Sequence, residues 1–361
     1  MKIFLLTDCP SPYQVEILNE IARDKDLTLQ VAYLRHKDPA RHWSARLISH
    51  EFVTLDDEPG QRTTARRHAS EADLAVFNYY LHPHAERLIW DRAVLKRPWC
   101  FWGERPGLRK PEWAGRLVRF WKLRWLHSSA APIWGIGRYA VDRYQAEFGM
   151  SRRYFNLPYF SDLERFNTAK QSQPPATSEP VFLFSGSLIH RKGVDLLAKA
   201  FVRLLREGYG ARLKIIGDGE LRSSLERTLH PVRPFVEFIG FVNWEDLPLH
   251  YAASHVLCVP SRYDGWGLVV PEGLASGLPV IATDRMGAAL EFIESGKNGW
   301  LIPAADEEAV FNAMRQAVSL SAPERARLGR CAQESVSGHS LQQGAIRFKQ
   351  YSSETVANWH A

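Results

Sequence analysis

Cysteines and long apolar runs are both scarce in this chain. Its four cysteines, Cys9, Cys100, Cys258 and Cys331, lie far apart in 361 residues and have no metal-ligand spacing. We therefore expect no metal site and reduced, mostly buried thiols, as in a cytoplasmic protein. No segment approaches the roughly 20 apolar residues of a membrane span. The N-terminal MKIFLLTDCP, with one lysine and a short apolar run, predicts a first β-strand rather than a signal peptide.

The rest of the composition is that of an ordinary globular protein. Hydrophobic residues make up 45% of the chain and charged residues 24%, and a length of 361 residues predicts two domains. The net charge of +6 is unevenly distributed, because residues 96–125 hold nine Lys or Arg against two Glu, with five tryptophans interleaved. This local excess indicates a partner of opposite charge, unless the fold itself accounts for it.

Short apolar runs alternate with amphipathic segments along most of the chain, which predicts parallel sheets with crossover helices. Residues 168–180, TAKQSQPPATSEP, lack apolar periodicity and predict a linker, after which the alternation restarts. We therefore expect Rossmann-like domains over residues 1–165 and 181–340, a linker over 166–180, and a final helix over 341–361. Two such halves imply a cleft between domains, a usual place for a ligand site.

Two carboxylates stand eight positions apart in residues 260–280, PSRYDGWGLVVPEGLASGLPV. Pro271 suits the first position of a helix, which we expect to end at Gly277. Asp264 then lies on a loop and Glu272 in the first helical turn, an arrangement suited to a ligand rich in hydroxyls. For Glu272 alone, the alternative is a charge that simply complements the helix dipole.

The same run resembles the acidic-x7-acidic signature of retaining glycosyltransferases of the family-4 type, the glycosyl transferases group 1. That family usually has Glu, Gly, Phe and Gly before its second Glu, whereas this chain has Asp264, Gly265, Trp266 and Gly267 before Glu272. The resemblance implies an α/β protein with the GT-B fold, in which two Rossmann-like domains face each other across a cleft. It implies that the first domain binds the acceptor, the second binds a nucleotide sugar, and the final helix crosses back to the first domain.

A second segment, GSLIHRKGVDLL, follows the apolar run that opens the second half. Its glycine Gly186 precedes a helix, so main-chain N–H groups can hold a phosphate, and Arg191 and Lys192 add two cations beside it. The alternative is an ordinary turn with a solvated basic pair. In the family, Lys192 matches the conserved lysine and Ser187 replaces an arginine, a contact for which Arg191 is the candidate substitute.

Two further glycine positions match the family, Gly217 in IIGDGE and Gly240, with Phe241, in FIGFV. Without the resemblance they indicate only turns at strand ends. The resemblance implies that main-chain groups there bind the nucleobase and that Glu272 holds the ribose hydroxyls. It assigns the donor-sugar hydroxyls to Asp264 and the diphosphate to Lys192 with Arg191. The backbone of residues 264–268, including Leu268, would line the sugar pocket.

The acceptor side is less clearly marked. The loop of residues 8–14 lacks the Gly-Gly pair of many relatives, although its residues 12–14 can still reach the cleft. No histidine follows the strand around Trp102, where many relatives carry one, so Glu104 is the candidate catalytic residue and Arg105 its neighbour. His82 and His84 follow the preceding strand, where a structural role is the alternative.

The segment WAGRLVRFWKLRWL, residues 113–126, predicts a helix with tryptophans on one face and arginines around it. Such a basic, tryptophan-rich helix is typical of proteins that bind membrane interfaces. The alternative is a helix that packs its aromatic face on the first sheet and leaves its arginines in solvent. Binding to an anionic membrane surface through residues 96–126 would suit a lipid-linked acceptor.

Together these features predict a retaining, metal-independent glycosyltransferase without a cofactor, which moves a sugar from a nucleotide diphosphate sugar to a hydroxyl acceptor. The expected setting is bacterial surface polysaccharide or lipopolysaccharide synthesis, in the cytoplasm or peripherally on the inner face of the cytoplasmic membrane. Two alternatives stay open: a nucleotide-sugar 2-epimerase on the same fold, and a non-enzymatic module that binds membranes or nucleic acid. No nucleic-acid motif accompanies the basic segment.

Overall fold

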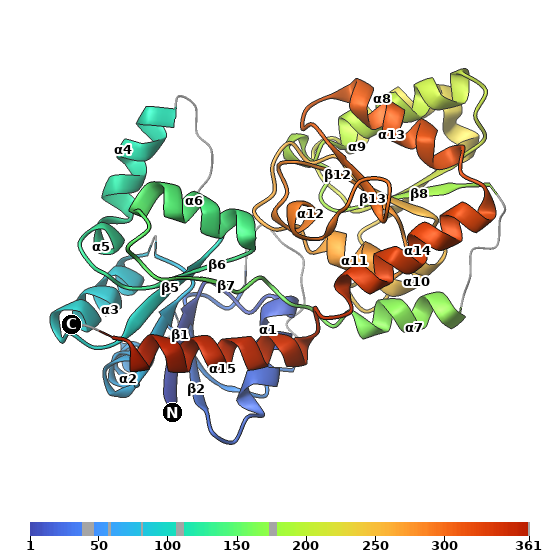
Figure 1. Cartoon of the computed structure of the whole chain (residues 1–361). Helices are drawn as coiled ribbons and strands as arrows, with labels where there is room; N and C mark the ends of the chain where they lie inside the picture. Colours follow the sequence, from blue (N-terminus) through green and yellow to red (C-terminus); the bar gives the residue numbers. More distant parts are fainter. Residues whose placement is uncertain (38–46, 57–58, 81, 106–111, 173–178, 360–361) are drawn as a thin grey trace. The chain divides into compact units, whose positions relative to one another are not determined.

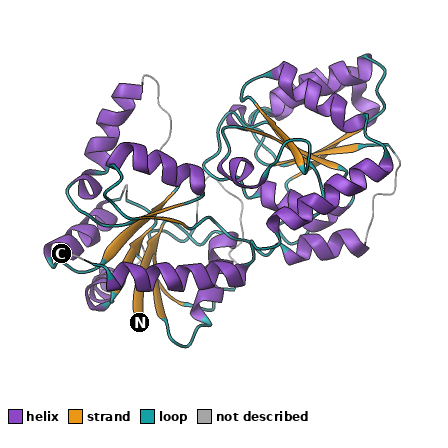
Figure 2. Ribbon diagram, viewed as in Figure 1, coloured by secondary structure: helices purple, strands orange, loops and turns teal. Residues whose placement is uncertain are grey.

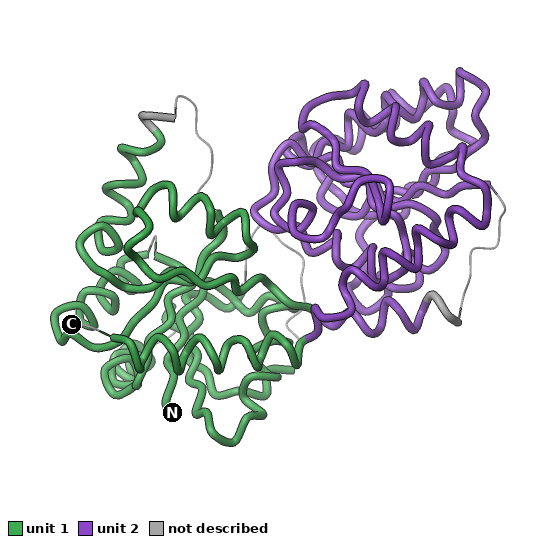
Figure 3. Tube along the Cα trace, viewed as in Figure 1, with its two compact units in different colours: residues 1–161, 341–361 green, residues 162–340 purple. Residues whose placement is uncertain are grey.

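The computed structural model describes all residues except 38–46, 57–58, 81, 106–111, 173–178 and 360–361 (Figure 1). The chain divides into two compact units (Figure 3). Unit 1 comprises residues 1–161 and 341–361, and unit 2 comprises residues 162–340. Each unit consists of a parallel sheet with helices packed on it (Figure 2).

Unit 1 contains a seven-stranded parallel sheet in the order β3-β2-β1-β4-β5-β6-β7. The chain adds strands to one side of β1 and then returns to add them on the other side. The order therefore reverses between β1 and β4, where ligands commonly bind in open α/β sheets. The strands are β1 Lys2–Thr7, β2 Thr28–Tyr33, β3 Glu51–Thr54, β4 Leu74–Phe77, β5 Trp99–Gly103, β6 Ile133–Gly135 and β7 Tyr154–Asn156.

Helices cover both faces of this sheet, because successive strand residues point to opposite faces. Phe101 and Ile133 belong to the core that includes α2, α3 and α6, whereas Trp102 and Trp134 contact Phe348 of α15 on the other face. The helices of unit 1 are α1 Pro12–Ala22, α2 Pro59–Glu71, α3 Pro83–Val94, α4 Glu112–Lys122, α5 Arg124–His127, α6 Arg138–Phe148 and α15 Leu341–Ala357.

The final helix α15 belongs to unit 1, although unit 2 separates it from the rest of that unit in sequence. Phe348 is 1% exposed and packs against Trp102 and Trp134, with ring centroids 6.4 and 5.5 Å away. At the surface, Lys349 forms ion pairs with Asp24 at 2.9 Å and with Asp26 at 2.6 Å. Burial of an aromatic side chain is the larger contribution, since exposed ion pairs stabilise little.

Unit 2 contains a six-stranded parallel sheet in the order β10-β9-β8-β11-β12-β13, so here the order reverses between β8 and β11. The strands are β8 Val181–Ser185, β9 Arg212–Ile216, β10 Val236–Gly240, β11 Val256–Val259, β12 Val280–Thr283 and β13 Gly299–Ile302. The helices are α7 Glu164–Ser172, α8 Val194–Arg206, α9 Arg222–Leu229, α10 Leu247–Ala252, α11 Val269–Ala275, α12 Gly287–Phe292, α13 Glu307–Val318 and α14 Ala322–Val336. Two 3₁₀ segments cover His190–Lys192 and His230–Phe235.

Two expectations about local structure are corrected. The predicted linker over 166–180 is wrong at its start, because residues 164–172 form α7, and residues 173–178 lie outside the described part. The helix forms because Phe166 is fully buried against Tyr251 of α10, with ring centroids 5.1 Å apart. The helix expected to begin at Pro271 begins at Val269 instead. Proline is tolerated in this first turn because N–H groups there have no intrahelical acceptor.

The four cysteines are free, and Cys9, Cys100 and Cys258 are buried. Mostly buried thiols were expected from their spacing.

Among the helices that the structure describes, none is both long enough and apolar enough to cross a membrane.

Truncation of Phe348 should destabilise unit 1. We expect Phe348→Ala to lower the free energy of unfolding by about 3–5 kcal/mol, because it removes a buried aromatic side chain between two tryptophans. Ile346→Ala on the same helix is the matched control, since Ile346 is 56% exposed and should change stability by no more than about 0.5 kcal/mol. Urea unfolding followed by tryptophan fluorescence measures both. Equal midpoints for the two variants would contradict the docking of α15.

Candidate functional site

The most prominent candidate site lies at the carboxyl ends of β8 and β11 in unit 2, where the strand order reverses. These strands are hydrogen-bonded neighbours, with Phe182 opposite Val256 and Leu183 opposite Leu257. The segments that follow them therefore emerge side by side. After β8 comes the 3₁₀ turn of residues 190–192, and after β11 comes the loop of residues 260–268. In open parallel sheets, ligands bind at such a position.

This geometry brings three of the predicted residues together. The Lys192 Nζ donates a hydrogen bond to the Asp264 carboxylate at 2.5 Å. The Arg191 guanidinium lies 3.7 Å from the same carboxylate and donates to the main-chain carbonyl of Tyr263 at 3.0 Å. Lys192 and Asp264 are mostly buried, whereas Arg191 is more exposed. A carboxylate flanked by two cations can exchange one of them for a ligand, so the cluster suits an anionic, hydroxyl-bearing molecule.

Arg262 and Asp195 were missed by the sequence reasoning, and they connect the same two segments. Arg262 binds the Asp195 carboxylate through two hydrogen bonds of 2.7 Å each. Burial disfavours ionisation of Asp195, but hydrogen bonds from Arg262 and its charge outweigh this, so the pKa of Asp195 is lowered. These hydrogen bonds raise the pKa of Arg262 in turn. Asp195 lies in the segment GSLIHRKGVDLL, and this position was the sequence signal that could have identified it.

Close main-chain contacts explain two of the glycines. Gly193 has φ +69°, and a Cβ there would lie 1.9 Å from the Pro260 carbonyl oxygen. Gly217 has φ +121°, and a Cβ there would lie 2.0 Å from the carbonyl oxygen of Gly186. Any other residue would force these neighbouring segments apart. The Gly217 N–H also donates to the Gly240 carbonyl at 2.7 Å, so the predicted nucleobase glycines lie along one edge of the sheet. Phe241 beside them is exposed.

Glu272 lies in α11 and is 4% exposed. The hydroxyl group of Tyr251, itself buried in α10, donates to the Glu272 carboxylate at 3.4 Å. Burial and then the negative charge of Glu272 raise the pKa of this tyrosine, and the neighbouring Ser185 at the end of β8 lowers it. Tyr251 thus links Glu272 to the strand that precedes the Lys192 turn. No sequence signal marks this residue beyond its place in an amphipathic helix.

Trp266 belongs to the run expected to line the sugar pocket, but its side chain is not exposed. It is 1% exposed and packs on Phe292 and His339, with ring centroids 5.9 and 6.1 Å away. Its side chain therefore belongs to the interior of unit 2. Gly267 has φ +90°, and a Cβ there would lie 2.6 Å from Met286 and 3.7 Å from the Asp264 carboxyl carbon. What residues 265–267 offer a ligand is their main chain.

In unit 1 the candidate residues are more dispersed. Glu104 is exposed after β5, and its main-chain carbonyl accepts a hydrogen bond from Tyr144 at 2.6 Å. Arg105 is buried, with its guanidinium 4.6 Å from the centre of the Tyr139 ring. His82 has a local structural contact, because its Nδ1 accepts a hydrogen bond from the N–H of His84 at the start of α3.

A polar cluster that was not predicted from the sequence lies where the strand order of unit 1 reverses. Gln14 is buried in the first turn of α1, and its Nε2 donates to Asn78 at 2.8 Å and to Thr7 at 3.0 Å. Thr7 ends β1, and Asn78 follows β4. Residues 12–14, expected in a loop, open α1 instead. Of these, Gln14 is directed toward the carboxyl edge of the sheet.

The tryptophan-rich segment bends at Leu123 into α4 and α5. Trp121 is 66% exposed, and Leu117, Val118 and Phe120 are exposed as well. Trp125 is half-buried, and the side chain of Trp113 lies outside the description. Arg119 is mostly buried in an ion pair with Glu147 at 2.7 Å, whereas Arg116 and Lys122 are exposed. The alternative in which the aromatic face packs on the sheet therefore fails for Trp121. We name the exposed residues 116–118 and 120–122 the α4 patch.

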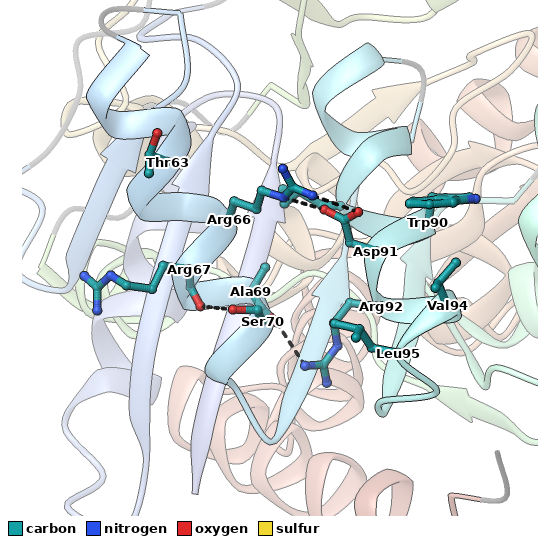
Figure 4. A pocket seen from close by; sticks show the side chains of 11 residues that line it. Thr63, Arg66, Arg67, Ala69, Ser70, Trp90, Asp91, Arg92, Val94 and Leu95 are labelled. Atoms are coloured by element: carbon teal, nitrogen blue, oxygen red, sulfur yellow. Dashed lines mark hydrogen bonds and ion pairs between the residues drawn. The ribbon is translucent and has the colours of Figure 1, made fainter.

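A separate pocket of about 460 Å³ lies between α2 and α3 (Figure 4). Arg66 crosses it to bind Asp91 at 2.7 Å. The fully buried Arg92 donates to the carbonyl groups of Ala69 and Ala72 at 2.9 Å. Burial lowers the pKa of Arg92 to about 10. The charges lining this pocket are thus used within the fold, and none of the predicted site residues lines it.

Among the described residues, no group of three or more His, Cys, Asp or Glu side chains is placed to hold a metal ion.

Comparison with known proteins finds similarity to one family of glycosyltransferases. The model for "Glycosyl transferases group 1" matches residues 165–335, which span most of unit 2. A GDP-mannose-dependent alpha-(1-6)-phosphatidylinositol monomannoside mannosyltransferase of Mycolicibacterium smegmatis is 26% identical over 328 residues, 84% of this chain and 83% of the relative. A GDP-mannose-dependent monoacylated alpha-(1-6)-phosphatidylinositol monomannoside mannosyltransferase of Corynebacterium glutamicum is 30% identical over 181 residues, 46% of this chain and 48% of the relative.

The fold has close counterparts among solved structures. The crystal structure of Anabaena HepE in complex with UDP superposes with a TM-score of 0.77 at 18% identity, over 98% of this chain and all of that one. The two Rossmann-like units are therefore of the GT-B type. The chain is similar to a named glycosyltransferase over most of its length, and residues 165–335 match the group 1 glycosyltransferases, as the Asp264–Glu272 run predicted. This assignment disfavours both the epimerase and the non-enzymatic alternatives.

The contact between Gly193 and Pro260 can be tested by adding one methyl group. Gly193→Ala should destabilise unit 2 by more than the roughly 1–2 kcal/mol that a left-handed backbone costs an L-residue, because the Pro260 carbonyl must also move. Gly208→Ala is the matched control: its φ is +88°, with nothing within 4 Å of the added Cβ. Free energies of unfolding from denaturant titration measure the difference. Equal losses in the two variants would contradict the close approach.

Proposed function

We propose that this protein transfers a sugar from a nucleotide diphosphate sugar to a hydroxyl acceptor with retention of anomeric configuration. The observation that carries the proposal is the Lys192–Asp264 contact at the switch point of unit 2, the unit that the family model matches. A cation and a carboxylate at one point suit the two chemical parts of such a donor, its diphosphate and its sugar hydroxyls.

Each predicted residue has a role in this proposal. Lys192, with Arg191, neutralises the diphosphate as negative charge develops on it, so that no metal or cofactor is expected. Asp264 accepts hydrogen bonds from the donor sugar, and Glu272, fixed by Tyr251, accepts them from the ribose. The main chain around Gly186, Ser187, Gly217 and Gly240 lines the nucleotide, with Phe241 at its margin, and the main chain of 265–268 lines the sugar.

Retention is proposed to follow a same-face route, because no residue of the chain is a convincing covalent nucleophile. The acceptor oxygen forms a bond to the anomeric carbon on the face from which the diphosphate departs. The bond between that carbon and the phosphate oxygen breaks, and the departing phosphate takes the proton of the acceptor hydroxyl. The products are a glycoside and a nucleoside diphosphate. Lys192 stabilises the nucleoside diphosphate. Glu104 of unit 1 is the proposed acceptor-side residue.

The proposed acceptor is a lipid-linked glycan or glycolipid of a bacterial surface polysaccharide or lipopolysaccharide. Support comes from the α4 patch, and from relatives whose names include phosphatidylinositol monomannoside as acceptor and GDP-mannose as donor. A basic patch with an exposed tryptophan is suited to the interface of an anionic bilayer. We therefore also propose peripheral attachment to the inner face of the cytoplasmic membrane.

Nucleotide release tests the enzymatic proposal. We expect the wild type to release nucleoside diphosphate from one member of a panel of UDP-, GDP-, ADP- and dTDP-sugars with EDTA present. Glu272→Ala should lower this rate by about 10- to 150-fold, the effect of losing hydrogen bonds to a charged group. Glu226→Ala, which removes an exposed carboxylate paired with Arg222, is the control and should keep full activity. Equal rates in the two variants would overturn the role of Glu272, and a donor isomerised without release would indicate an epimerase.

Vesicle co-sedimentation tests the membrane proposal. The wild type should bind vesicles of phosphatidylglycerol and phosphatidylcholine at low salt. Arg116→Glu combined with Lys122→Glu should weaken binding by at least about 30-fold, because each cation near an anionic surface contributes about 1 kcal/mol. Arg119 is left unchanged because it pairs with Glu147. Met150→Ala, at another exposed apolar residue of unit 1, is the control. Wild-type protein that stays in the supernatant would refute membrane attachment.

A further inference from the structure

Arg262 holds together the two segments that carry the proposed donor-binding groups. It lies two residues before Asp264 on the loop after β11, and Asp195 lies three residues after Lys192 in the first turn of α8. Both guanidinium Nη atoms of Arg262 donate to the Asp195 carboxylate at 2.7 Å. Such a two-point contact fixes the orientation of the two groups as well as their separation.

The same arginine makes two more contacts with the 3₁₀ turn. Its Nη1 donates to the His190 carbonyl at 2.7 Å, and its main-chain N–H donates to the Arg191 carbonyl at 2.9 Å. In the opposite direction, Arg191 donates to the Tyr263 carbonyl at 3.0 Å. The turn and the loop are thus tied on both sides of the Lys192–Asp264 contact.

The side chains of Arg262 and Asp195 are only 21% and 28% exposed. Partial shielding and two-point geometry distinguish this pair from an ordinary surface ion pair, whose contribution is small. Arg262 bonds to the turn and to Asp195, whereas Lys192 bonds to Asp264. Arg262 can therefore act on a bound diphosphate through the position of the turn that carries Lys192.

We propose that Arg262 is a positioning residue for the donor diphosphate: through Asp195 and the His190 carbonyl, its side chain fixes Lys192 relative to Asp264. The inference rests on the proposed function, because it assigns the diphosphate to Lys192. Without Arg262, the turn can shift against the loop, and Lys192 spends less time where the phosphates bind. The nucleoside contacts at Glu272 and along Gly217 and Gly240 do not depend on this arginine.

The test separates the diphosphate from the nucleoside. Calorimetry with uridine, guanosine, adenosine and thymidine and with UDP, GDP, ADP and dTDP gives the gain in affinity that the two phosphates provide for whichever base the wild type binds. Lys192→Ala should reduce that gain by at least about tenfold, the lower end for a hydrogen bond to a charged group. Arg262→Ala should reduce it to a similar extent while leaving nucleoside affinity within about twofold, a difference of less than 0.5 kcal/mol.

The double variant Lys192→Ala with Arg262→Ala decides whether Arg262 acts through Lys192. We expect diphosphate affinity equal to that of Lys192→Ala alone, because a positioning residue has no effect once its target is gone. Arg203→Ala is the matched control. It lies on α8 with Asp195 and loses its pairs with Glu207 and Glu308, but should bind UDP or GDP as the wild type does.

Asp195→Asn serves as a second route if Arg262→Ala does not fold, since it keeps the side-chain shape and removes the charge. It should match Arg262→Ala in the diphosphate gain. Equal weakening of nucleoside and diphosphate, or a further loss in the double variant, would overturn the positioning role. A wild type that binds none of UDP, GDP, ADP and dTDP would instead contradict the proposed function, and this inference with it.

Discussion

The close approach of two main-chain segments at the carboxyl edge of unit 2 is the constraint on which the site depends. The turn after β8 and the loop after β11 meet at Gly193 and Pro260, where no side chain fits between them. They can meet because β8 and β11 are parallel neighbours and end at the same edge. A switch point alone provides a place for a ligand. Here the glycine contact makes it compact enough for Lys192 to reach Asp264.

The charges at this edge are arranged in two pairs with different surroundings. Arg262 donates to both oxygens of Asp195 and to the His190 carbonyl, so this interaction is internal to the protein. Lys192 meets Asp264 through a single nitrogen. A diphosphate can compete for that lysine, and sugar hydroxyls can take its place on the carboxylate. One pair thus holds the geometry, while the other is suited to exchange partners with a donor.

Tryptophan has opposite uses within unit 1. Trp102 and Trp134 are buried and form the surface on which α15 docks, with the Trp102 indole nitrogen donating to the Leu157 carbonyl. Trp121 lies outside on α4 among cations. Residue type does not distinguish these cases. The first two occupy buried strand positions. The third lies on α4, where Arg119 pairs with Glu147 and the buried Leu123 follows the end of the helix.

Much of the architecture was determined locally, and the sequence alone was sufficient for it. Buried parallel strands appear as short apolar runs, so the alternation predicted two Rossmann-like units, and the Asp264–Glu272 run indicated the family. Local patterns also failed in identifiable places. The polar composition of 168–172 suggested a linker, yet Phe166 buried on Tyr251 makes 164–172 helical. Trp266 lies in the run expected to line the sugar pocket, but its side chain packs on Phe292 and His339.

Contacts between residues far apart in the chain could not be predicted from the sequence. Arg262 and Asp195 are separated by 67 positions, and Tyr251 and Glu272 by 21. No periodicity links them, because their proximity follows from strand order and crossovers rather than from local spacing. Sequence reasoning could identify the chemical groups that the chain carries and most of the strands and helices that it forms. The packing of β8 beside β11 decided which of those groups meet, since only the folded sheet brings their loops to one edge.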